Sequence, residues 1–147
     1  MKARKFVQES YDNNDKYARD IFKAFITGKN HFVTKNEEDM MHDVVTLKGG
    51  CVYYFELEVK RGREFTTRES FPFGTVSFTG RKIRLHNQQP FWYIIICWES
   101  DYALMCHSSV IYNEEYKEQI NINTVHRQGK DEFYRVPKEK VKFFKIK

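Results

Sequence analysis

The chain is 147 residues long, with 31% charged residues, 16% aromatic residues and a formal net charge of +5. A chain of this length can bury a substantial core, and the high aromatic content argues against a disordered polymer. We therefore expect one folded domain over residues 1–147. The basic excess is compatible with a polyanionic partner such as nucleic acid.

Cysteine usage and the apolar runs bear on where the protein works. The cysteines Cys51, Cys97 and Cys106 lack the paired spacing of a disulfide or metal framework, which favours reduced thiols. The first residues lack the apolar core of a signal peptide, and the longest apolar run, 91–98, is too short for a membrane helix. These features predict a soluble, cytoplasmic protein without a membrane partner.

Helical spacing of apolar residues predicts one long helix near the start of the chain, over residues 8–30. Asp12, Asn13 or Asn14 can cap its start, and Gly28 is the expected stop. Strands are predicted where apolar residues alternate or run together between turn residues. By range, the expected strands are 31–35, 43–47, 51–60, 76–85 with a bend near Gly80, 91–98, 102–111 and 131–147 with an interruption at Pro137. One helix followed by many strands predicts an α/β or α+β domain with a central mixed β-sheet flanked by helices.

The hairpin over residues 43–60 carries the most informative pattern in the chain. Two strand-like runs flank the turn at Lys48-Gly49-Gly50. On the second run, one face holds apolar side chains: Tyr53, Phe55, Leu57 and Val59. The other face holds Tyr54 and the charged positions: Glu56, Glu58 and Lys60. Because successive side chains of a strand alternate between its faces, two carboxylates and one ammonium share one side of the strand.

Two interpretations fit this charged face: an ordinary solvated surface, or a metal site. Mg2+ prefers oxygen ligands, commonly one or two carboxylates with water and a substrate phosphate. Asp43, on the partner strand, and Glu58 are suitable ligands, and Lys60 is placed to orient an attacking water. The sequence contains neither the GxSxG motif of a nucleophile elbow nor the HExxH motif of a zinc protease.

An Asp followed, after a short hairpin, by Glu-x-Lys resembles the PD-(D/E)XK nuclease superfamily, which has the restriction-endonuclease-like fold. The family order is a helix, the Asp-bearing strand, the Glu-x-Lys strand, a further strand, a helix and a last strand. Roughly the first two-thirds of this chain is compatible with that order. The proline of the motif is missing, because Met41 and His42 precede Asp43.

The resemblance implies a catalytic set made of Asp43, Glu58 and Lys60. It also implies Mg2+ or Mn2+ bound by Asp43, Glu58 and the carbonyl of Val59, with Glu56 in support. Alternatives stay open: Asp39 can replace Asp43 and Glu56 can replace Glu58. An acidic residue of the first helix can also contribute, and the candidates are Glu9, Asp12, Asp15 and Asp20.

Basic side chains after the motif are the expected contacts to the phosphates of nucleic acid. They are Arg61 and Arg63 after the strand, then Arg81, Lys82 and Arg84, the last two on one strand face. The predicted function is metal-dependent endonuclease cleavage of DNA rather than RNA. We expect a homodimer or delivery by a partner protein, as for small nucleases of phages and mobile elements. The alternatives are a non-catalytic nucleic-acid-binding domain of the same fold, and a structural or assembly protein without an active site.

Overall fold

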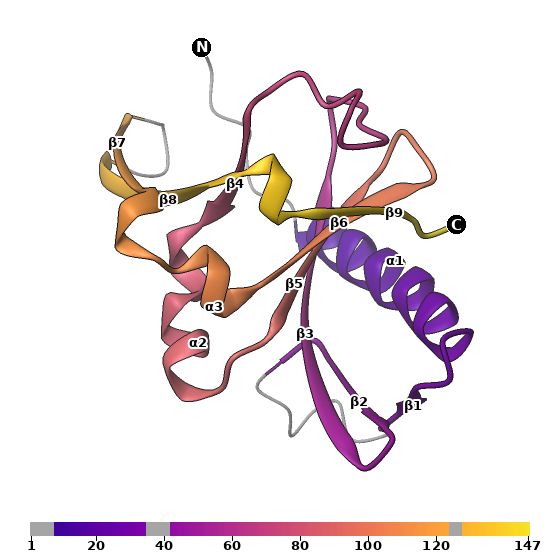
Figure 1. Cartoon of the computed structure of the whole chain (residues 1–147). Coiled ribbons are helices and arrows are strands. Elements are labelled where there is room, and N and C mark those ends of the chain that lie inside the picture. The colour runs from indigo at the N-terminus through magenta and orange to yellow at the C-terminus, as the bar shows by residue number, and fades with distance from the viewer. Residues whose placement is uncertain (1–7, 35–41, 124–127) are drawn as a thin grey trace.

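The computed structural model describes residues 8–34, 42–123 and 128–147, and side chains at 14–34, 42–119 and 131–147 (Figure 1). These residues form a mixed α/β structure with a six-stranded mixed sheet and a three-stranded antiparallel sheet. The helices are α1 (Gln8–Thr27), α2 (Ile83–Gln88) and α3 (Ser108–Ile111), with 3-10 turns η1 (Gly80–Lys82), η2 (Glu114–Tyr116) and η3 (Lys138–Lys140). The strands are β1 (Phe32–Val33), β2 (Val44–Lys48), β3 (Cys51–Lys60), β4 (Thr75–Thr79), β5 (Trp92–Cys97), β6 (Tyr102–His107), β7 (Lys117–Asn123), β8 (Gln128–Pro137) and β9 (Lys142–Lys145).

The large sheet places β3 in its interior, and this position matters for the site. Its strand order is β1-β2-β3-β5-β6-β9. β3 pairs with β2 in antiparallel fashion and with β5 in parallel fashion. A parallel neighbour needs a crossover connection, which here runs through the second sheet at β4 and then through α2.

Helix α1 covers one face of the large sheet (Figure 1). Ala18, Phe22 and Ile26 are spaced one helical turn apart and are all buried. They pack on Phe55 and Leu57, and the ring centroids of Phe22 and Phe55 lie 4.7 Å apart. The apolar face predicted for the 51–60 strand is therefore confirmed as core.

The boundaries of α1 agree with the sequence at one end only. The helix ends at Thr27, and the N–H of Gly28 still donates to the carbonyl of Ala24 at 3.3 Å, so the predicted stop is confirmed. The predicted cap is wrong, because α1 begins at Gln8 and the residues from Asp12 to Asn14 lie inside it. Polar residues on the solvent side of a helix resemble caps when only local sequence is considered.

The hairpin turn is confirmed. Lys48 pairs with Cys51, so Gly49 and Gly50 form a two-residue turn with φ of 57° and 77°. Positive φ at both positions favours glycine and suits the twist of the flanking strands. The turn sets the register of β2 on β3, and in that register Val44 lies opposite Phe55.

The second sheet, in the order β4-β8-β7, packs on the other face of the large sheet. Val76 and Phe78 of β4 and Tyr134 and Val136 of β8 are fully or nearly fully buried. They form one cluster with alternate residues of the two central strands: Tyr93, Ile95 and Cys97 of β5, and Leu104 and Cys106 of β6. The strand predicted over 91–98 is confirmed as β5, and its residues from Tyr93 to Cys97 are buried on both faces of the large sheet.

The strand predicted over 76–85 is wrong in its second half. β4 ends at Thr79, whose side chain accepts from the N–H of Arg81 and caps the turn η1, and α2 follows. A Cβ at Gly80 would approach the carbonyl oxygen of Glu132 to 2.8 Å, so glycine permits this departure from the sheet. Lys82 and Arg84 therefore do not share a strand face. The apolar residues Ile83 and Leu85 pack on the core from helical positions.

The strand predicted over 102–111 is confirmed as far as His107 and is wrong beyond it, because Ser108–Ile111 form the helix α3. After Asn113 the chain forms the turn η2 and then strand β7. Residues 131–147 contain strands on both sides of Pro137, with β9 at the edge of the large sheet. All three cysteines are free thiols, as predicted. None of the described helices is long and apolar enough to span a membrane.

Candidate functional site

A cavity of about 590 Å³ lies where α1, β3, η1 and β8 meet. We call it the acidic cavity because five of its lining residues are carboxylates: Asp15, Asp43, Glu56, Glu58 and Asp131. The basic residues that line it are Arg81 and Lys82, and Val59 and Tyr93 complete the part discussed here. The predicted residues Asp43, Glu56, Glu58 and Val59 are therefore brought together in one place.

Asp43, immediately before β2, is held by two hydrogen bonds to β3, each between a backbone N–H and a side-chain carboxylate. Its carboxylate Oδ2 accepts from the N–H of Leu57 at 2.8 Å, and its own N–H donates to Oε2 of Glu56 at 2.9 Å. Burial, and then the negative charge of Glu56, raise the pKa of Asp43 above its ordinary value. A carboxylate that is destabilised in its charged form gains from a nearby cation, and Lys82 already acts in that direction.

Glu56 is almost fully enclosed and saturated with donors. Its side chain is 5% exposed, Oε2 contacts Nδ1 of His42 at 3.2 Å, and Oε1 accepts from Nζ of Lys82 at 3.0 Å. Burial by itself raises the pKa of Glu56, but the hydrogen bond from His42 and the charge of Lys82 outweigh it and lower the pKa. The position beside His42, Asp43 and Lys82 makes Glu56 an anchor for its neighbours.

Glu58 has a more open environment than Glu56. It is half-buried, and its Oε2 accepts from the hydroxyl of Tyr93 at 2.8 Å. Burial raises the pKa of Tyr93 strongly, and the charge of Glu58 raises it further, so the hydroxyl remains a donor. Among the described side chains, Tyr93 is the hydrogen-bond donor to Glu58, which leaves the second carboxylate oxygen for a ligand.

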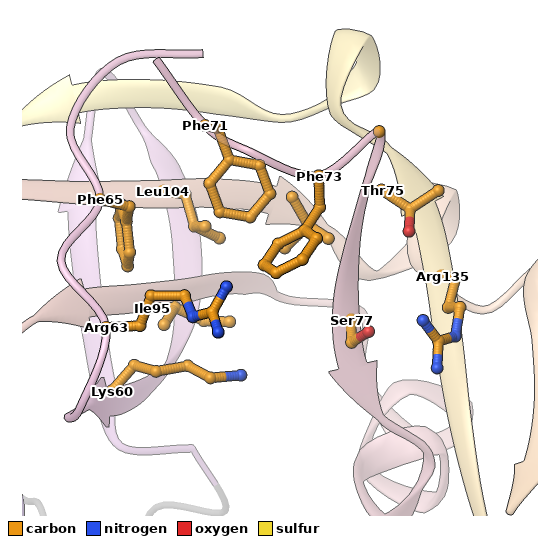
Figure 2. A pocket seen from close by; sticks show the side chains of 12 residues that line it. Lys60, Arg63, Phe65, Phe71, Phe73, Thr75, Ser77, Ile95, Leu104 and Arg135 are labelled. Carbon is orange, nitrogen blue, oxygen red and sulfur yellow. The ribbon is translucent and has the colours of Figure 1, made fainter. Parts of the chain in front are cut away.

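Lys60 lies on the same face of β3 as Glu58, as the alternation of the strand predicts. It does not line the acidic cavity, however, but an adjoining hollow (Figure 2). Lys82 of η1 supplies the ammonium of the acidic cavity: its Nζ hydrogen-bonds to Glu56 and lies 5.1 Å from the ring centroid of Tyr93. The sequence predicts Lys82 as a nucleic-acid contact. No local pattern indicates that this residue, more than 20 positions away, reaches the Glu56 carboxylate.

The other predicted basic contacts divide between several places. Arg81 borders the acidic cavity and pairs with Asp131 at 3.2 Å. Arg61 stacks on the ring of Trp98 with its Cζ 3.7 Å from the centroid, and Arg84 is exposed on α2. Arg63 borders the adjoining hollow with Lys60.

Among the acidic candidates of the first helix, Asp15 is the one that borders the acidic cavity, and it also pairs with Arg19. Asp20 is exposed and pairs with Lys16 at 2.9 Å. The side chains of Glu9 and Asp12, and the whole of Asp39, lie outside the described part of the chain. Asp15 was one of four equal candidates in the sequence, and its place in the tertiary structure separates it from Asp20.

Asp43 and Glu58 are the candidate ligands for a divalent cation in the acidic cavity. Within the described residues, no three His, Cys, Asp or Glu side chains converge closely enough to form a complete metal cluster. Asp43 and Glu58 each accept one hydrogen bond on one oxygen from this part of the chain. Two carboxylates with a free oxygen each are a donor set that Mg2+ accepts when waters and substrate phosphate complete its coordination.

No protein-family model, no curated protein and no solved structure matches this chain. A function for this chain must therefore be inferred from the residues of the site itself.

Proposed function

We propose that this chain hydrolyses phosphodiester bonds of nucleic acid with the help of Mg2+ or Mn2+ in the acidic cavity. The observation that carries the proposal is the convergence of Asp43, Glu58 and Lys82 on one cavity, in which Glu56 accepts hydrogen bonds from both Asp43 and Lys82. Carboxylates beside a fixed ammonium are the groups needed to bind a hard cation and a phosphate at once.

The order of elements supports a restriction-endonuclease-like core. Helix α1 comes first, then the two-residue β1, then Asp43 and β2, then β3 with Glu58, then β4, α2 and β5. Apart from the extra β1, and with β4 in the second sheet, this is the order expected from the resemblance to the PD-(D/E)XK superfamily. α2 is only six residues long, so the helix before the last strand is shorter than the family pattern implies.

Asp43 and Glu58 would hold the cation, and Val59, the next residue of β3, also lines the acidic cavity. When bound, the cation lowers the pKa of a water and neutralises charge on the phosphate. The reaction itself is simple: water forms the new P–O bond, one bridging P–O bond breaks, and the water proton leaves with solvent or the departing oxygen. No covalent enzyme intermediate is required.

Lys82 takes the role that the sequence pattern assigns to Lys60. Its ammonium is fixed by the nearly buried Glu56 carboxylate and is itself 23% exposed, so it can donate to a phosphate oxygen or to the attacking water. Glu56 in turn is a positioning residue in this proposal, because its oxygens already accept from His42, Asp43 and Lys82.

The test is a cleavage assay with purified protein on duplex DNA, single-stranded DNA and RNA, with Mg2+, with Mn2+ and with a chelator. We expect metal-dependent cleavage that Asp43→Asn and Glu58→Gln abolish. The matched control is Asp101→Asn, an exposed carboxylate at the β5–β6 turn, which should leave cleavage unchanged.

Two lysine variants decide between the alternative ammonium groups. Lys82→Gln keeps a donor for Glu56 but removes the charge, and should lower kcat about 100-fold, as removal of one transition-state donor does. Lys60→Gln should affect KM more than kcat. The reverse pattern would return the role to Lys60, and no cleavage of any substrate would favour the non-catalytic nucleic-acid-binding alternative.

A further inference from the structure

A second hollow, of about 420 Å³, follows the acidic cavity along the same face of β3 (Figure 2). Its walls come from the end of β3 and the loop after it, from β4, and from one residue each of β5, β6 and β8. We call it the basic-aromatic hollow after its main lining residues: Lys60, Arg63, Phe65, Phe71, Phe73 and Arg135. Its volume is within the range of sites that bind small molecules or one nucleotide, about 300–1,000 Å³.

The charges around this hollow are all positive. Lys60 and Arg63 reach into it from one side, and Arg135 lies on the other side beyond Ser77 (Figure 2). In the part of the chain that the structure describes, no acidic side chain lines it. Within the described residues Arg135 pairs with Glu118, whereas Lys60 and Arg63 have no acidic partner. Two cations without a counter-charge make the hollow attractive to an anion such as phosphate.

Aromatic rings form part of the wall of the basic-aromatic hollow. Phe73 is 47% exposed, which is unusual for so large an apolar side chain, and the guanidinium Cζ of Arg63 lies 4.8 Å from its ring centroid. Phe71 supports Phe73 edge-on, with centroids 5.8 Å apart. A planar group can replace or join the guanidinium on this ring, as bases do on aromatic side chains in single-strand-binding proteins.

The acidic cavity and the basic-aromatic hollow are lined by neighbouring positions of the same three strands. On β3, Glu58 lines the acidic cavity and Lys60 lines the hollow. The corresponding residues are Thr79 and Ser77 on β4, and Phe133 and Arg135 on β8. On each strand the step is two residues, which is about 7 Å in an extended chain. This is roughly the length of one nucleotide in a stretched strand.

We propose that the basic-aromatic hollow binds one unpaired nucleotide of the substrate strand, adjacent to the phosphodiester that is cleaved in the acidic cavity. The base stacks on Phe73, and Lys60 and Arg63 hold its phosphate. This inference rests on the proposed function, because it places the nucleotide next to the phosphodiester that is cleaved. A base inside a duplex cannot enter a hollow of this size, so the substrate class is single-stranded or locally unpaired nucleic acid.

The test measures binding without catalysis, in chelator, by fluorescence anisotropy of labelled oligonucleotides. The probes are single-stranded DNA, single-stranded RNA of the same sequence, and blunt duplex DNA. Phe73→Leu keeps apolar bulk but removes the ring face, and should weaken binding of a single strand about tenfold while leaving duplex binding unchanged. The matched control is Phe32→Leu on β1, which is 62% exposed and far along the sheet, and which should change nothing.

The two cations have their own readout. The double variant Lys60→Gln, Arg63→Gln should reduce the slope of log affinity against log salt by about 0.7 for each phosphate contact that is lost on a single strand. An unchanged slope, or equal losses for single strand and duplex in Phe73→Leu, would overturn the proposal.

Failure of this inference is distinguishable from failure of the proposed function. If no substrate is cleaved but single-strand affinity still depends on Phe73, the hollow stands and the catalytic proposal does not. If cleavage depends on Asp43 and Glu58 while Phe73→Leu alters neither single-strand affinity nor KM, the catalytic proposal stands and the hollow is excluded. The single strand, DNA or RNA, that loses more affinity in Phe73→Leu identifies the natural substrate strand.

Discussion

The two faces of β3 lie in different environments, a packed core on one side and two ligand-sized hollows on the other. Toward α1, Phe55 and Leu57 pack against a helix, and only shape and apolar area matter. Toward the second sheet, Glu56 and Glu58 face the acidic cavity, and Lys60 faces the basic-aromatic hollow. The second sheet packs on alternate residues of β5 and β6, but it leaves this side of β3 open enough for a ligand. One strand therefore supplies both core and site.

Within the site, Glu56 and Glu58 differ in their burial and in their hydrogen-bond partners. Both lie on the same strand face, but Glu56 is buried among three donors and Glu58 is half-buried beside one. Charge on Glu56 serves the fold, and charge on Glu58 is available to a ligand. Stability and activity should therefore respond differently to substitutions at four positions. The expected effect on stability decreases in the order Phe22, Glu56, Asp43 and Glu58.

On the packed side, Phe22→Ala should lower the free energy of unfolding by about 3–5 kcal/mol, the usual loss when a fully buried aromatic ring is removed. Phe22 is 1% exposed and its ring contacts that of Phe55. Urea denaturation measures the change, with Phe32→Ala on the exposed edge strand as control. A loss below about 1 kcal/mol would show that α1 is not part of the cooperative core.

On the open side, Glu56→Gln should destabilise the protein by about 3 kcal/mol at neutral pH, because it leaves the Lys82 ammonium without its buried counter-charge. The pKa of Glu56 is lowered by folding, so its stabilisation is present above the ordinary value of 4.5 and is lost as pH falls through the folded-state value. Denaturation at a series of pH values should show the variant and the unmodified protein converging in acid. A pH-independent difference would mean that packing, and not charge, explains the loss.

Asp43→Asn should have the opposite sign. Because burial and Glu56 raise the pKa of Asp43 in the folded protein, its ionised form opposes folding at neutral pH. The variant should be more stable than the unmodified protein there, and the gain should shrink as pH falls through the raised folded-state pKa and vanish below the ordinary value of 3.8. The same variant should lose cleavage. Gain of stability with loss of activity is expected of a group strained for function, and a destabilised Asp43→Asn would contradict this account.

Glu58→Gln should change stability least, by about 0.5 kcal/mol or less, since the amide oxygen can still accept from Tyr93 and the site is partly open to water. Cleavage and metal affinity, measured by calorimetry, should both fall sharply. If Glu58→Gln instead destabilises the protein as much as Glu56→Gln does, the distinction between the two carboxylates is wrong.

Local pattern was sufficient for the elements that depend on neighbours in the chain. The long helix, the turn at Gly49 and Gly50, the alternation of β3 and the hairpin of β5 and β6 were all predictable, because helical and strand periodicity and positive-φ turns are short-range properties. The alternation was also enough to place Glu56, Glu58 and Lys60 on one face.

Tertiary structure decided what those residues can do. The turn at Gly80 takes the chain out of β4 and brings Lys82 to Glu56, while Lys60 falls into the next hollow. Whether a carboxylate is saturated or free, and where a second sheet ends, depends on contacts between residues far apart in sequence. Periodicity indicates the direction of a side chain but not its partners. The two faces of β3 were therefore predictable, and the different roles of Glu56, Glu58 and Lys60 were not.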